Sequence, residues 1–340
     1  MNNKFLNALK RVPQAVPPIW FMRQAGRYHR HYQVLREKHS FMDLCKVPGL
    51  AAEVALGPVL DFDFDVAILF SDLLFPLEAM GMGLKYEPGP ELGWHLTEAN
   101  LHSLRPVNEA LGFLEFQKQA MLETRRVLPK EKSLIGFVGG PWTLFTYAIE
   151  GAHKGGLEKS KCALSLFEPF SQKLIPLLKE NIRLQIEGGA EVVMVFDTSA
   201  GEVAPSLYRE TIVPKIADLA RSFPKKLGYY AKGVQPSHLV DPFFDDANGF
   251  CGLGFDHRWE IGEVLAGRRC GFVQGNFDQA LLFSEPSEFK VHVEKYLQPI
   301  RRLPLEKRAG WVSGLGHGVL PNTPEANVRE LIRLIREVMS

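Results

Sequence analysis

Eight short apolar runs rich in β-forming residues recur along this chain, and longer stretches with helical periodicity separate them. Parallel strands that alternate with helices are typical of α/β proteins. The chain has 340 residues and no Ser/Gly/Pro-rich linker, so we expect one (β/α)8 barrel domain over 1–340, with a doubly wound sheet as the alternative. The runs occupy 18–22, 66–71, 134–139, 192–197, 226–231, 249–255, 271–276 and 310–315.

Helices outside the regular alternation are expected near the N-terminus and in the long interval 72–133, which also holds a hairpin pattern at 83–94. Two other helices carry end signals. The stretch 167–190 ends on a glycine pair suited to a C-cap, and the stretch 323–340 opens with Thr323 and Pro324 in the N-cap and N1 positions.

The charge balance excludes some classes of partner. Forty basic and 39 acidic side chains leave a net charge of +1 with no long run of one sign, which argues against a nucleic-acid face or an anionic-membrane patch. Any affinity for a highly charged ligand must then come from a local cluster. The four cysteines are scattered without a CxxC pair, and neither a secretory leader nor an apolar span is evident, so we expect free thiols and a cytoplasmic protein without a membrane partner.

Polar residues at the strand ends are the candidate site, because barrel enzymes place their chemistry at the C-terminal ends of the strands. Arg23 and Arg27 are spaced i and i+4, so on a helical turn they would share one face with Cβ atoms about 5 to 6 Å apart. Such a pair could grip two carboxylates, and a solvated surface pair is the alternative. The strand-end set is Arg23, Asp72, Thr198, Lys232, Asp256, Asn276 and His317.

Five motifs in order resemble the uroporphyrinogen decarboxylase family over nearly the whole chain. The most specific is Pro-x-Trp-x-Met-Arg-Gln-Ala-Gly-Arg-Tyr at 18–28, and ILFSD, GPWTLFTYAIEG, VQGN and LGHG follow at 68–72, 140–151, 273–276 and 315–318. The departures from the family pattern are Val138 and Gly140 in the Gly-Pro-Trp-Thr box, Thr198 for serine, Gly314 for asparagine, and QGNFDQ for QGNLDP.

The resemblance implies a reaction and a set of site residues. The family removes CO2 without a cofactor from the four acetate side chains of uroporphyrinogen III, giving coproporphyrinogen III in haem biosynthesis, and commonly forms homodimers. By resemblance Asp72 accepts hydrogen bonds from the pyrrole N–H groups and stabilises the cationic intermediate, and Arg23 and Arg27 bind carboxylates. The catalytic set is Asp72, Arg23, Tyr147 and His317, and further substrate contacts are Gln24, Arg27, Thr198, Phe137 and Phe196.

Each of these roles has a structural alternative. Asp72 could N-cap the next helix, His317 could be a loop histidine held by glycines, and Tyr147 and the two phenylalanines could be core residues. The proton donor stays open, because a guanidinium with a pKa above about 12 releases a proton reluctantly.

Three other kinds of enzyme site and a non-enzymatic carrier are alternatives to this function. Corrinoid methyltransferases of related fold bind zinc through a His-x-Cys pair, and none of the ten histidines here has a cysteine two residues later, so no metal is expected. Lys232 could form a Schiff base, although a surface lysine is the simpler explanation, and the loop GLGHG at 314–318 could cradle a phosphate but contains no lysine or arginine. A tetrapyrrole carrier without enzymatic activity would use the same arginines.

Overall fold

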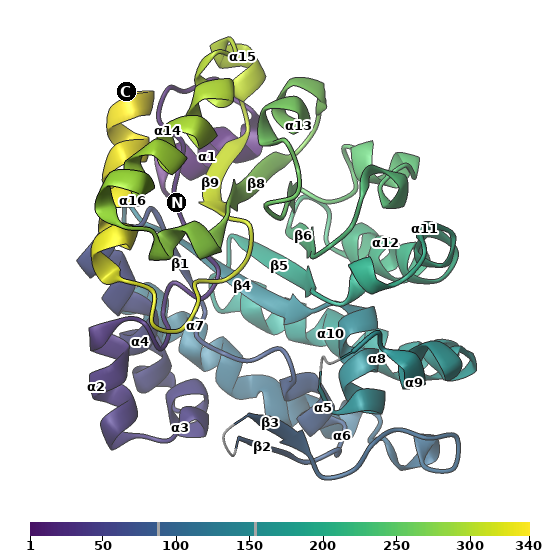
Figure 1. The fold of residues 1–340 in the computed structure, drawn as a ribbon. Helices are drawn as coiled ribbons and strands as arrows, with labels where there is room; N and C mark the ends of the chain where they lie inside the picture. The colour runs from purple at the N-terminus through teal and green to yellow at the C-terminus, as the bar shows by residue number, and fades with distance from the viewer. Residues whose placement is uncertain (87–88, 153–154) are drawn as a thin grey trace.

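The computed structural model describes residues 1–86, 89–152 and 155–340 and shows a curled, seven-stranded parallel sheet with helices around its outside (Figure 1). All neighbouring strands are parallel. This arrangement confirms the predicted α/β, barrel-like class. The strands in spatial order are β1 (Val66–Ile68), β4 (Ser133–Gly139), β5 (Val192–Asp197), β6 (Leu227–Ala231), β7 (Gly252–Gly254), β8 (Phe272–Phe277) and β9 (Trp311–Leu315).

The predicted first strand, at 18–22, is a single β-bridge and not a strand. Ile19 pairs in parallel with Ser313 of β9, and on its other side its carbonyl accepts a hydrogen bond of 3.0 Å from the N–H of Asp65. A ladder cannot extend here, because Pro18 has no N–H to donate and the N–H of Ile19 is bonded to the carboxylate of Asp65. The segment therefore lies between β9 and β1 without regular pairing.

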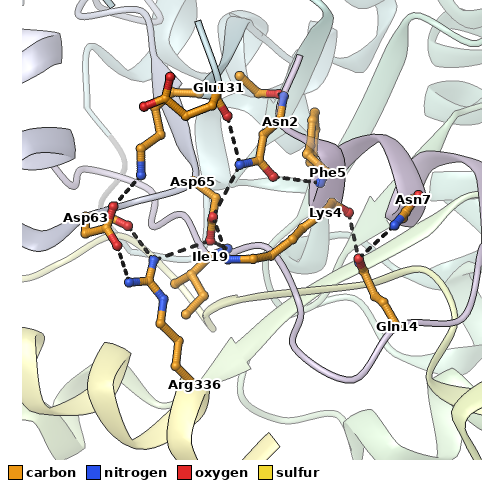
Figure 2. A network of polar contacts seen from close by, with 12 residues as sticks. Asn2, Lys4, Phe5, Asn7, Gln14, Ile19, Asp63, Asp65, Glu131 and Arg336 are labelled. Atoms are coloured by element: carbon orange, nitrogen blue, oxygen red, sulfur yellow. Dashed lines mark hydrogen bonds and ion pairs between the residues drawn. The ribbon is translucent and has the colours of Figure 1, made fainter. Parts of the chain in front are cut away.

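A buried carboxylate fixes this segment at the N-terminal end of the strands (Figure 2). Asp65 lies directly before β1, and its Oδ2 accepts the Ile19 N–H at 2.9 Å. Its Oδ1 accepts from Lys4 Nζ at 2.9 Å and from Asn2 Nδ2 at 3.4 Å, and Arg336 lies 3.6 Å from Oδ2. One side chain thus ties together the N-terminal segment, the start of β1 and the last helix.

Alternating side chains on the strands build two apolar layers. Along β5, Val192, Met194 and Phe196 belong to a cluster with Trp20 and Phe272 inside the curled sheet, and the residues between them pack against the outer helices. The helices before β1 are α1 (Asn3–Lys10), α2 (Arg30–Lys38), α3 (Phe41–Lys46) and α4 (Pro48–Phe62). Those after β4 are α8 (Pro141–Glu150), α9 (Glu158–Cys162), α10 (Phe167–Glu187), α11 (Pro205–Leu207), α12 (Val213–Ser222), α13 (Ile261–Gly267), α14 (Pro286–Arg301), α15 (Leu305–Arg308) and α16 (Glu325–Met339).

The interval between β1 and β4 holds α5 (Phe75–Ala79), α6 (Val107–Ala110), α7 (Glu115–Val127) and the predicted hairpin. Its strands β2 (Leu84–Tyr86) and β3 (Pro90–Leu92) pair antiparallel, with Leu84 opposite Leu92. Residues 87 and 88 of the predicted hairpin lie outside the described residues.

The two predicted helix ends have different outcomes. Helix α10 ends as expected, with Gly188 as C-cap and Gly189 at φ 108°. Helix α16 begins one position later than predicted: Pro324 is the N-cap, and Thr323 donates its hydroxyl to the carbonyl of Leu320 at 2.8 Å instead of capping. Within the described ranges, no helix is long and apolar enough to cross a membrane.

Candidate active site

A row of aromatic side chains crosses the C-terminal ends of the central strands. Phe137 of β4 lies 5.6 Å from Phe196 of β5, measured between ring centroids, and Phe196 lies 6.1 Å from Tyr230 of β6. The row ends at His317, in the loop after β9, whose ring lies 6.0 Å from that of Tyr230 and 14° from parallel. The predicted residues Phe137, Phe196 and His317 therefore belong to one row of ring contacts, with Tyr230 as an unpredicted member.

Hydrogen bonds to Tyr230 fix the orientation of His317. The Tyr230 hydroxyl donates to the carbonyl of Gly316 at 2.7 Å and lies 3.2 Å from His317 Nδ1. Because the hydroxyl has only one proton to donate, the second contact fits a proton on Nδ1. Burial raises the pKa of Tyr230, so this phenol stays neutral and keeps its proton.

Arg23 interacts electrostatically with one acidic residue and two tyrosines. It is exposed, adopts the left-handed conformation with φ 58°, and lies against Gly318, where an added Cβ would be 2.6 Å from Arg23 Cδ. Burial raises the pKa values of Asp72, Tyr147 and Tyr230, and the positive charge of Arg23 opposes each rise. Arg23 thus lies near both the acidic residue and the His317 end of the aromatic row.

Asp72 follows β1 and is half-buried. Its Oδ1 accepts the N–H of Leu74 at 2.9 Å, which makes a local turn before α5, whose N-cap is Leu74. Burial raises the pKa of Asp72, and Tyr86, the Leu74 N–H and Arg23 oppose that rise. The N-cap alternative for Asp72 therefore does not hold.

Two tyrosines lie close to Asp72. Tyr147 on α8 is half-buried, and burial together with the charge of Asp72 raises its pKa, so it remains a neutral phenol. Tyr86 ends β2 in the hairpin, and burial and Asp72 raise its pKa too. The Tyr86 hydroxyl is buried and has no partner among the described residues at hydrogen-bond distance and angle, so it lies near Asp72 without being aligned to it.

The geometry predicted for the two arginines is wrong. Residues 21–29 form successive turns and α2 begins only at Arg30, so Arg23 and Arg27 do not share a helical face. The left-handed conformation at Arg23 interrupts any right-handed helix there. Arg27 is exposed and its charge acts on Tyr32, and among the described residues neither arginine is paired with an acidic side chain.

Gln24, which was predicted to contact substrate, has its side chain bonded within the fold. Its side chain is fully buried, its Oε1 accepts the N–H of Phe21 at 3.1 Å, and its Nε2 donates to the carbonyl of Val66 at 3.0 Å. Both ends of the amide are thus used to hold the turn against β1. Thr198, in the turn after β5, is half-buried.

Three other strand-end residues have structural roles. Asp256 accepts the N–H of Gly233 at 2.6 Å and pairs with Arg258 at 2.7 Å. Asn276 Nδ2 donates to the carbonyls of Asp256 and Trp259, both at 2.8 Å. Lys232 lies in the turn after β6, where its carbonyl accepts the N–H of Gly201. Across the described part of the chain, His, Cys, Asp and Glu side chains form no group of three that could hold a metal ion.

A sequence model described as Uroporphyrinogen decarboxylase (URO-D) matches residues 1–338. The chain belongs to the uroporphyrinogen decarboxylase family. The chain is 33% identical to the uroporphyrinogen decarboxylase of Solibacter usitatus, with 99% of this chain and 98% of that one aligned. It is 34% identical to a uroporphyrinogen decarboxylase of Thermus thermophilus over the same shares of both chains. A methyltransferase from Methanosarcina mazei has the same fold, with TM-score 0.76, 20% identity and coverage of 100% of this chain and 99% of that one.

Two glycines that depart from the pattern of the uroporphyrinogen decarboxylase family make room for neighbouring side chains. A Cβ on Gly140 would lie 2.4 Å from Cγ of Asp197, and a Cβ on Gly314 would lie 2.1 Å from Nε2 of Gln274. Asp197, Tyr86 and Tyr230 are not among the site residues predicted from the sequence. For Tyr230 a signal existed, because it is the last residue but one of a predicted strand.

Proposed function

We propose that this protein is a cofactor-independent uroporphyrinogen decarboxylase, which converts the four acetate side chains of uroporphyrinogen III to methyl groups and releases CO2 and coproporphyrinogen III. The observation that carries the proposal is the grouping of Arg23, Asp72 and Tyr147 near the aromatic row at one end of the sheet. Membership of the family gives the substrate class.

The substrate makes different demands at its centre and at its rim. Its four pyrrole N–H groups would cost about 1 to 3 kcal/mol each if they were buried without acceptors, and the carboxylate of Asp72 can accept several of them. Its eight carboxylates need cations at the rim, where Arg23 and Arg27 are exposed and unpaired with acids among the described residues. Phe137 and Phe196 form the apolar wall against the macrocycle.

Decarboxylation needs a place for the electron pair that CO2 leaves behind. Protonation of the pyrrole α-carbon next to the carbon that bears the acetate makes an iminium-like ring, which accepts the pair at the acetate-bearing carbon as the carbon–carbon bond to CO2 breaks. A second protonation, at the exocyclic methylene carbon, gives the methyl group, and loss of the first proton from the ring α-carbon restores the neutral pyrrole. Asp72 beside the ring nitrogens stabilises the cationic ring when it is ionised, because its negative charge is then in place as the positive charge develops. Burial raises the pKa of Asp72, and the charge of Arg23 is among the contributions that favour its ionised form.

Tyr147 and His317 bind substrate carboxylates in this proposal, and Thr198 contributes a hydroxyl. Tyr147 is a neutral phenol near Asp72, so it can donate a hydrogen bond to an anion. Arg23 is the candidate for proton relay, because its charge acts on Asp72, Tyr147 and Tyr230. Gln24, given its buried bonds, holds the loop that presents Arg23.

We extend the proposal to the assembly and the closure of the sheet. The segment 18–20 acts as the eighth member of the barrel, since Ile19 contacts both β9 and the residue before β1. A cytoplasmic homodimer is the expected state by family resemblance. Sedimentation of the purified protein tests the dimer.

Anaerobic incubation with uroporphyrinogen III, followed by counting of product carboxylates, tests the activity. Stepwise loss of four carboxylates with released CO2 is the expected result. Binding without CO2 release would instead identify a tetrapyrrole carrier. The matched variant Asp72→Asn keeps the shape of the side chain and removes its charge, so near-normal turnover by this variant would reject the role of Asp72.

A further inference from the structure

We propose that Asp197 is a positioning residue that holds Tyr147 and Thr198 in place for the substrate. This inference rests on the proposed function, since it assumes that these two side chains contact the tetrapyrrole. Asp197 ends β5 and is fully buried, so it cannot contact a ligand itself. It acts through the elements that it joins.

The Asp197 carboxylate accepts three hydrogen bonds from protein groups. Its Oδ1 accepts the N–H of Thr143 at 2.9 Å and the hydroxyl of Thr143 at 2.6 Å. Its Oδ2 accepts the hydroxyl of Tyr229 at 3.3 Å, and that hydroxyl in turn accepts one from Tyr208 at 3.0 Å. The carboxylate is therefore held from two sides, by a helix and by a strand.

Thr143 connects this carboxylate to both proposed substrate contacts. It occupies the third position of α8, where a negative charge is favourable to the helix dipole, and Tyr147 lies four residues later on the same face of the helix. The Thr143 hydroxyl also accepts the N–H of Ser199 at 3.1 Å. The Thr143 hydroxyl thus bonds to both neighbours of Thr198, Asp197 and Ser199, and ties the turn to the start of the helix that carries Tyr147.

Gly140 is required by this arrangement. Its N–H donates to the carbonyl of Phe196 at 2.7 Å, which brings the start of α8 against the end of β5. A Cβ at this position would lie 2.4 Å from Cγ and 2.5 Å from Cβ of Asp197. An alanine here would have to displace the carboxylate, so it disturbs the same positions without removing a charge.

A purely structural role for Asp197 is the competing explanation. Burial raises the pKa of Asp197 to about 6, so the ionised carboxylate is costly in this place and a neutral amide would be tolerated by the fold. An amide, however, provides only one acceptor oxygen for the donors that the carboxylate serves. A carboxylate at this position therefore has a role that an amide cannot fill, which is to hold α8 and the turn after β5 in place.

A double-mutant cycle between Asp197→Asn and Tyr147→Phe separates the two explanations. If Asp197 positions Tyr147, Asp197→Asn lowers kcat/KM about tenfold, and adding Tyr147→Phe lowers it little further, because the phenol is already misplaced. Thr143→Val and Gly140→Ala are expected to show the same non-additivity. The Kd for uroporphyrin, the stable oxidised macrocycle, is measured for the same four proteins, because this measurement does not depend on turnover.

The control is Asp65→Asn, another buried aspartate, located at the opposite end of the strands. In the double variant Asp65→Asn/Tyr147→Phe, the fold-changes of the two single variants should multiply, both for kcat/KM and for Kd. Multiplicative effects for Asp197→Asn as well, or a wild-type kcat/KM in that variant, would overturn the inference. If wild-type protein binds uroporphyrin but releases no CO2, the proposed function fails while the Kd cycle still decides the role of Asp197.

Discussion

His317 lies nearly parallel to Tyr230, at 14° between ring planes, and the Tyr230 hydroxyl bonds to the carbonyl of the residue before the histidine. The histidine is therefore oriented by a strand, although it belongs to a loop. Its direction depends on one phenol that is buried and neutral.

Tyr230→Phe removes that hydroxyl while it keeps the ring contact. We expect kcat/KM to fall about tenfold, because His317 loses a partner and the Gly316 carbonyl loses its hydrogen bond. The measurement is steady-state decarboxylation, with His317→Ala as the reference background. Tyr230→Phe should cost little in that background, and an equal loss in both backgrounds would show that the hydroxyl acts independently of His317.

Arg23→Met should change the pH dependence of the reaction. The charge of Arg23 lowers the pKa of Asp72, so its loss raises that pKa and moves the acid limb of kcat/KM to higher pH. Arg27→Met is the matched control, because Arg27 is also exposed but does not contribute to the pKa of Asp72. An acid limb that shifts equally in both variants would contradict this arrangement.

Gly318→Ala should weaken substrate binding without unfolding the protein. The added methyl group would lie 2.6 Å from Cδ of Arg23, whose exposed side chain can move away from its position near Asp72. We expect KM to rise several-fold with an unchanged melting temperature. Gly49→Ala in α4, where nothing lies within 4 Å of the new Cβ, should leave KM at the wild-type value.

Asp65→Ala should lower the free energy of unfolding by about 2 to 3 kcal/mol, because it leaves the buried Ile19 N–H without its acceptor and removes the carboxylate that pairs with the partly exposed Lys4 and Arg336. Urea denaturation measures the change. Asp63→Ala removes a largely exposed carboxylate that also contacts Arg336 and should cost no more than about 1 kcal/mol. Equal losses in the two variants would show that Asp65 does not fix the segment at 18–20.

The stability of the wild type relative to Asp197→Asn should depend on pH. The folded-state pKa of Asp197, about 6, lies above the unfolded value of about 3.9, so protonation favours the folded state. This contribution is present at low pH and is lost as the pH rises through about 6. When the pH is lowered from 8 to 5, the free energy of unfolding of the wild type should rise by about 1 kcal/mol relative to that of the variant, because the amide that replaces Asp197 in the variant does not titrate. Parallel pH curves for the two proteins would show that Asp197 is not the titrating group.

Much of the sheet was predictable because buried strands of parallel sheets are short apolar runs. Seven of the eight runs are strands of the sheet. The run at 18–22 has the right composition, but Pro18 has no N–H and the N–H groups of Ile19 and Phe21 bond to side chains. The hairpin and the end of α10 were also predictable, since glycines mark them. The start of α16 was misplaced by one residue because the Thr323 hydroxyl bonds backward to Leu320.

The site was predictable in its members but less so in its geometry. The arginine spacing suggested a helix, and only the left-handed conformation at Arg23 and the buried amide of Gln24 explain why the segment turns instead. The roles of Asp197 and Tyr86 depend on contacts between distant parts of the chain, which a local pattern does not contain. The residues predicted to contact substrate remain predictions that the experiments above test.

Gly140 and Asp197 are 57 positions apart, yet the space for one depends on the size of the other. Natural variation at the two positions should therefore be correlated. In a relative with alanine or serine at the position of Gly140, the acidic group at the position of Asp197 must be absent, longer or turned aside. Exchanging only one of the two residues for its counterpart in such a relative should destabilise the contact, whereas exchanging both should preserve it. The start of α8 and the end of β5 are therefore expected to change together in evolution.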